Sequence, residues 1–110
     1  MDIPERPVRE YAKVFFRDPV RVGGVILMGA YVIEHDYERM AQGRPCTHIY
    51  AAHDTRLPVI TFHCKHLARP KTPQATVTLR RGPDAMTRVF TLVEYQFERS
   101  ADGHGVPDTW

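Results

Sequence analysis

Two short Cys-x-His units carry the side chains of this sequence that are best suited to chemistry. They are Cys46-Thr47-His48 and Cys64-Lys65-His66. Thiolates and neutral imidazoles are the donors that tetrahedral zinc prefers. Together the units offer two sulfurs and two ring nitrogens. The pattern therefore predicts one zinc site, made by Cys46, His48, Cys64 and His66.

The same cysteines leave two other interpretations open. A Cys46–Cys64 disulfide would close a loop of nearly twenty residues, and without strain it would stabilise the fold by about 3 kcal/mol. Alternatively, Cys46 and Cys64 are two small buried hydrophobic side chains that happen to be thiols. Two cysteines alone indicate neither a redox state nor a cellular compartment.

The elements that must position the two units are β-strands. Residues 46–52 and 57–67 are β-prone runs, and His53-Asp54-Thr55-Arg56 between them is a turn sequence. A strand places residues i and i+2 on one face, so the cysteine and the histidine of each unit share a face. A hairpin of these strands would set Cys46 opposite Cys64 or, with the register shifted by two, opposite His66.

The rest of the chain has the same strand-and-turn character. Nine prolines and seven glycines separate short apolar runs, which is typical of many strands joined by turns. The sequence predicts an all-β fold, a small antiparallel β-sandwich or barrel of six to eight strands with at most one short helix, over residues 36–42. We expect a flexible N-terminal arm (1–10), a single β-domain (11–98) and a loose C-terminal tail (99–110).

The predicted core consists of apolar residues that recur along these strands. On residues 30–35, the alternation places Tyr31, Ile33 and His35 on one face. The core set is Val14, Phe16, Val25, Leu27, Tyr31, Ile33, Ile49, Ile60, Phe62, Val77, Leu79, Val93, Tyr95 and Phe97.

The composition of the chain argues against several classes of protein. Of the 110 residues, 43% are hydrophobic and 25% charged, which is enough apolar surface to exclude disorder of the whole chain. The net charge of +2 has no dense basic stripe, so a nucleic-acid partner is not expected. No apolar run is long enough to span a bilayer. The start has no signal-peptide core, which predicts a cytoplasmic protein as written, or an exported one if the chain is a trimmed mature form.

No motif in the sequence assigns a catalytic residue. A nucleophile elbow, a phosphate loop, a dinucleotide fingerprint and a metalloprotease helix are all missing from the sequence. The first functional hypothesis is therefore a non-catalytic binding or structural β-module, and the zinc-binding domain is the second. The third is a hydrolase-type enzyme with a His–carboxylate pair, using His63 or His104. A further hypothesis is that copies of the chain form a homo-oligomer by pairing an exposed edge strand.

Three stretches of the sequence resemble a known group of proteins. They are Asp18-Pro19-Val20-Arg21-Val22-Gly23-Gly24 with Gly29-Ala30-Tyr31, Pro45-Cys46-Thr47-His48-Ile49-Tyr50 with Pro58-Val59-Ile60-Thr61-Phe62-His63-Cys64, and Glu94-Tyr95-Gln96-Phe97 with Gly103-His104-Gly105-Val106-Pro107. In these stretches the chain resembles a loosely defined group of small bacterial β-rich proteins of unknown function. The resemblance implies a small β-domain, often behind an export signal that this sequence lacks. It implies no activity, and it draws attention to the cysteine pair.

Overall fold

The computed structural model describes residues 8–82, 88–108 and 110 of the chain. These residues form eight strands and one short helix, which confirms the all-β prediction. In chain order the elements are β1 (Arg9–Val22), β2 (Val25–Asp36), α1 (Tyr37–Ala41), β3 (Thr47–Ala51), β4 (Ile60–Phe62), β5 (Lys65–Ala68), β6 (Thr76–Arg81), β7 (Phe90–Gln96) and β8 (Asp102–Gly105). No helix in this part of the chain has the length and apolar character needed to cross a membrane.

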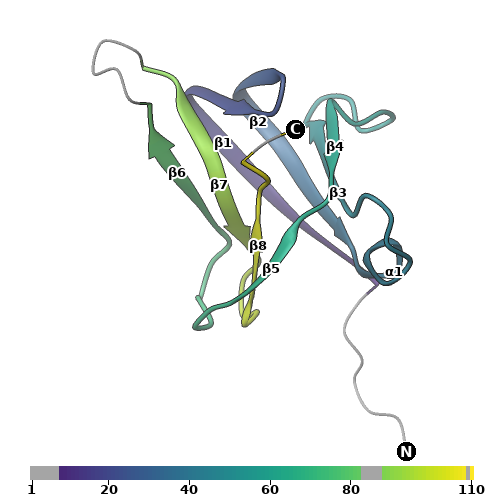
Figure 1. Ribbon diagram of the computed structural model, residues 1–110. Helices are drawn as coiled ribbons and strands as arrows, with labels where there is room; N and C mark the ends of the chain where they lie inside the picture. The colour runs from purple at the N-terminus through teal and green to yellow at the C-terminus, as the bar shows by residue number, and fades with distance from the viewer. Residues whose placement is uncertain (1–7, 83–87, 109) are drawn as a thin grey trace, which may run out of the picture.

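The strands build one curved sheet that has the shape of half a barrel (Figure 1). Its order is β4-β3-β2-β1-β7-β8-β5, and β6 pairs with β7 as well. The pairing of β1 with β7 is parallel, from Val20 opposite Phe90, and the other pairings of the sheet are antiparallel. In Figure 1, β5 and β8 cross in front of β1 and β2. We call the side of the sheet that holds the core its inner face, and the opposite side its outer face.

β1 and β2 form a long hairpin that is interrupted by a bulge. Its turn contains Gly23, whose φ of +59° is a conformation that glycine adopts without strain. Phe16 lies opposite Gly29, but Val20 lies opposite Leu27, so the hairpin contains a bulge at residues 17–19. The sequence break at Arg17-Asp18-Pro19 is therefore a bulge within one strand, where proline's missing amide is tolerated.

The short helix begins and ends as the sequence predicts. Asp36 is its N-cap, and one side-chain oxygen accepts a hydrogen bond of 3.0 Å from the backbone N–H of Arg39. Gly43 follows the helix at φ +71°. The helix thereby joins the end of β2 to the start of β3, which places His35 and Cys46 side by side in space.

The core covers the inner face of the half-barrel. Its buried members are Phe16, Val20, Val22, Leu27, Ile33, Ile49, Phe62, Leu92, Tyr95 and Phe97. Two predicted core residues are corrected. Leu79 is 36% exposed, and Leu92 is buried in place of Val93. Leu79 is exposed because β6 lies at an edge and, among the described strands, pairs only with β7. Val93 is displaced by a bulge in β7, because Thr78 pairs with Glu94 while Leu79 pairs with Leu92. The extra residue shifts the alternation that the sequence pattern assumed.

Both predicted terminal segments are partly in the sheet. Arg9 and Glu10 already belong to β1, and residues 1–7 of the expected arm lie outside the described residues. At the other end, the expected loose tail contains β8, which pairs with both β5 and β7. The Trp110 ring packs edge-on against Phe62, with the ring centroids 5.0 Å apart.

Gly103 makes the close packing of β8 compatible with an ion pair. Arg69 donates two hydrogen bonds to Glu94, of 2.7 and 2.9 Å. A Cβ atom on Gly103 would lie 2.7 Å from a Glu94 oxygen and 2.8 Å from Cγ of Arg69. Such distances are too short, so only glycine leaves both the ion pair and the strand in place.

We expect Gly103→Ala to destabilise the fold by about 1–3 kcal/mol, the usual cost of forcing extra atoms into a packed site. Urea denaturation measures this change in the free energy of unfolding. Gly24→Ala is the matched control, because a Cβ on Gly24 meets nothing within 4 Å. Equal stability of the two variants would show that β8 can move away from the ion pair at no cost.

Candidate metal centre

Cys46 and Cys64 meet at the junction of β3, β4 and β5. Their sulfur atoms lie 3.2 Å apart, and both residues are free cysteines. Two backbone hydrogen bonds anchor Cys46, which donates its N–H to the carbonyl of Phe62 at 3.2 Å and accepts from the N–H of Asp36 at 2.8 Å. Cys64 lies in the two-residue break between β4 and β5. The approach of the two sulfurs is therefore set by the backbone of three strands.

His35 completes a group of three donors with the two thiols. The sulfur atoms of Cys46 and Cys64 and one ring nitrogen of His35 all lie within 4.8 Å of one another. His35 is the last residue but one of β2, on the inner face, and its exposed fraction is 0%. Both of its ring nitrogens are buried and make no hydrogen bond in the described part of the chain. A buried imidazole normally has a partner, so these nitrogens need an explanation.

His104 lies beside the three donors. Its Nδ1 atom is 3.7 Å from the Cys64 sulfur, and its ring stacks on that of His35 with centroids 4.1 Å apart. On its other side lies the ring of Tyr95, at 4.9 Å. The Tyr95 hydroxyl and the Thr47 hydroxyl are hydrogen-bonded to each other and fully enclosed. These aromatic and polar contacts fix the position of β8 against the cysteines.

The electrostatics of the thiol pair favour one thiolate. The hydrogen bond between the thiols lowers the pKa of Cys46 to about 4 although burial opposes the change, and the neighbouring His35 adds to it. The same hydrogen bond, together with burial and the charge of Cys46, raises the pKa of Cys64. The pair therefore releases one proton at neutral pH and holds the second. A bound cation would supply the positive charge that favours loss of the second proton.

The structure brings together the two cysteines of the predicted zinc set and neither of its histidines. The hairpin register sets Thr47 opposite Phe62, and the chain then leaves β3, so β5 pairs with β8. On β5, His66 pairs with Asp102 at 2.8 Å and is largely exposed. His48 points to the outer face, where its Nδ1 lies 3.3 Å from a Glu34 oxygen. The expected hairpin thus ends too early to align the two Cys-x-His units.

His48 and Glu34 form a second arrangement of titratable groups. They lie directly opposite each other on β3 and β2, and the Tyr50 hydroxyl donates to Glu34 at 3.2 Å. They line a groove of about 370 Å³ on the outer face, together with Arg9 and Arg39. Such a pair can orient an imidazole for proton transfer. The described residues that line the groove include no serine or cysteine to act as its nucleophile, and the His–carboxylate enzyme stays a prediction.

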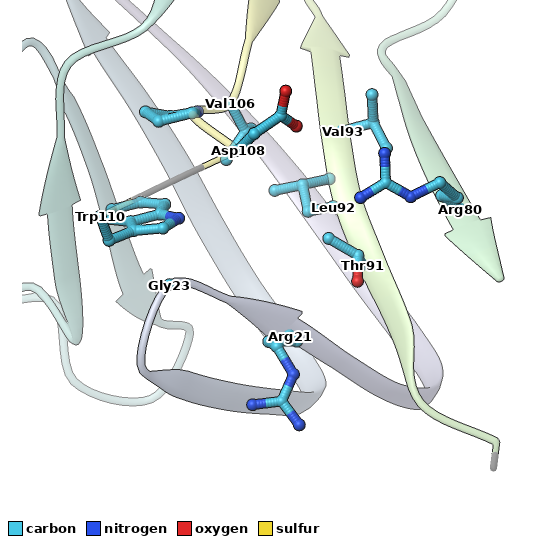
Figure 2. Close-up of a pocket in the computed structure, with 10 residues that line it drawn as sticks. Arg21, Gly23, Arg80, Thr91, Leu92, Val93, Val106, Asp108 and Trp110 are labelled. Atoms are coloured by element: carbon cyan, nitrogen blue, oxygen red, sulfur yellow. The ribbon is translucent and has the colours of Figure 1, made fainter. Parts of the chain in front are cut away.

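A pocket of about 200 Å³ lies at the end of the half-barrel where the chain terminates. Figure 2 shows the Trp110 ring over Gly23 on one side of it and the Arg80 side chain on the other. Leu92 is the only buried residue among the described residues of its lining. The pocket thus contains no buried polar group that could select a ligand, in contrast to the cysteine site.

His35, which belongs to the group of three donors, and His104, which lies beside it, are absent from the set predicted by the sequence. For His35 a signal exists, since the alternation of residues 30–35 places it on the same face as Ile33. For His104 no such signal exists, because it stands between Gly103 and Gly105 in a stretch without apolar alternation. His53 and His63 are exposed, so they remain outside the cluster.

Comparison of the chain with models of protein families, with curated proteins and with solved structures finds no match.

Proposed function

We propose that this chain is a zinc-binding β-domain whose ion is held by His35, Cys46 and Cys64, with His104 as the adjacent fourth donor. The observation that carries the proposal is the His35 imidazole, which is buried, has no hydrogen-bond partner among the described residues and lies beside two thiols. Burying an imidazole without a partner costs free energy, and a metal bond removes that cost. Two thiolates and two imidazoles match the ligands of structural zinc.

The burial of the site supports a structural role for the ion. His35, Cys46 and His104 are all buried, and only Cys64 has moderate exposure. A catalytic zinc keeps one coordination position open to substrate, whereas a structural zinc is enclosed by its ligands. The proposal therefore agrees with the hypothesis of a non-catalytic module, in which zinc joins β2, β3 and β8.

Native mass spectrometry of the reduced protein with added zinc chloride tests this function. We expect one zinc ion per chain, with loss of the thiol protons that it displaces. His35→Asn removes a donor while retaining a similar size, and it is expected to lose most of the bound zinc.

His48→Asn is the matched control, because His48 lies on the outer face beside Glu34. It is expected to bind zinc as the unmodified chain does. The proposal fails if the unmodified chain binds no zinc, or if His35→Asn and His48→Asn bind equal amounts.

A further inference from the structure

The two sulfurs are arranged so that they can either share a metal ion or bond to each other. Sulfur atoms bound to one tetrahedral zinc at about 2.3 Å are separated by roughly 3.8 Å, and a disulfide bond is about 2.05 Å long. The separation of 3.2 Å in the structure lies between these values. Small side-chain rotations therefore connect the metal-bound arrangement with the bonded one.

The two cysteines differ in how an oxidant reaches them. Cys46 is 2% exposed and is enclosed by β2, β3 and β4, whereas Cys64 has intermediate exposure. Cys64 also lies outside the regular strands, where the chain passes from β4 to β5. A small dissolved oxidant therefore reaches the Cys64 sulfur first, and the buried Cys46 sulfur lies 3.2 Å from it.

We propose that a hydroperoxide oxidises this thiol pair to a Cys46–Cys64 disulfide and that the oxidation releases the zinc ion, which places zinc binding by this domain under redox control. This inference rests on the proposed zinc function and names its regulation. The geometry carries it, since two thiols in contact, one buried and one partly exposed, have the arrangement of a resolving and an attacking cysteine.

The chemistry balances with hydrogen peroxide as the oxidant. With zinc bound, both sulfurs are thiolates. The Cys64 thiolate attacks one peroxide oxygen, the O–O bond breaks, and the products are a sulfenic acid on Cys64 and hydroxide, which takes a proton to form water. The Cys46 thiolate then attacks the Cys64 sulfur, the S–S bond forms, and the second hydroxide leaves and is protonated to water. The sulfurs lose two electrons and peroxide gains them.

Disulfide formation removes both anionic donors from the site. Zinc is then left with neutral imidazoles, His35 and His104, and these compete poorly with water and with chelators. Reduction by a dithiol restores the thiolates and with them the site. The ion is thus bound under reducing conditions and released under oxidising ones.

Titration of the zinc-loaded, full-length protein with hydrogen peroxide tests the inference. A chromogenic chelator reports free zinc, and intact-mass spectrometry reports the oxidation state. We expect one zinc released for each disulfide formed, with a mass loss of two hydrogens, and rebinding after a dithiol is added. His66→Asn, which changes the exposed neighbour of Cys64, is expected to behave identically, whereas Cys64→Ser cannot form the bond.

The two proposals fail at different steps. If the protein binds no zinc before peroxide is added, the zinc function itself is wrong. If zinc binds but peroxide releases none, the switch is wrong and the zinc function stands. The switch is also overturned if zinc leaves while the mass rises by oxygen atoms, because the sulfurs are then oxidised separately.

Discussion

Zinc is expected to raise the melting temperature of the reduced protein by about 15 °C. A ligand that binds only the folded state stabilises it by about 4 kcal/mol at a free concentration of about 1,000 times its Kd, and a domain of this size gains about 4 °C per kcal/mol. In Cys64→Ser we expect about a third of that rise. Structural zinc sites provide about 10–16 kcal/mol from four ligands, so one lost ligand costs about 3 kcal/mol, a weakening of about 100-fold.

Differential scanning calorimetry with and without zinc measures both values. His66→Asn is the matched control, since His66 lies two residues further along the chain but pairs with Asp102 at the surface. It should retain the full rise. A rise of the same size in Cys64→Ser would place the ion somewhere other than the thiol pair.

Phe97→Ala is expected to destabilise the protein by about 3–5 kcal/mol, the usual cost of deleting a buried aromatic ring. Phe97 is 3% exposed and follows β7 directly. Its ring packs edge-on against Tyr95 and His104, at centroid distances of 5.6 and 5.7 Å. The loss is a large fraction of the stability of a domain of this size, and it loosens the contact that positions β8 beside the cysteines.

Urea denaturation of Phe97→Ala and Phe15→Ala shows whether the loss of stability depends on burial of the side chain, because both variants truncate a phenylalanine. Phe15 lies on the outer face of β1 and is 70% exposed, so its truncation is expected to change stability by less than about 0.5 kcal/mol. Comparable losses in the two variants would contradict the assignment of inner and outer faces.

The strands could be predicted because their signals are local. Alternating apolar residues place Ile33 and Phe97 inside the fold, and both are buried. The misassigned Val93 depends on a register shift, and the pairing of β8 with β5 joins residues far apart in sequence. The sequence of one strand shows neither its register shifts nor its partner strands, because both are decided by how the strands pair.

The site could be predicted only in part for the same reason. The two cysteines drew attention by type and spacing, and they lie together in the structure. Their meeting does not come from the predicted ladder, since the chain leaves β3 after Phe62 and carries His66 to β8. Which imidazole reaches the sulfurs is decided by where β2 ends and by how β8 crosses, and neither is encoded within the Cys-x-His units.

The parallel pairing of β1 with β7 has a consequence for how the protein reaches its native state. Strands so distant along the chain can meet only after large loops are closed, and folds dominated by such contacts form slowly, on the millisecond-to-second scale. His104, 40 residues beyond Cys64, arrives by the same late closure. Until then the cysteines belong to a nascent chain without a finished pocket. Occupancy by zinc would therefore mark molecules that have completed folding, and in a cell it would distinguish them from kinetic intermediates.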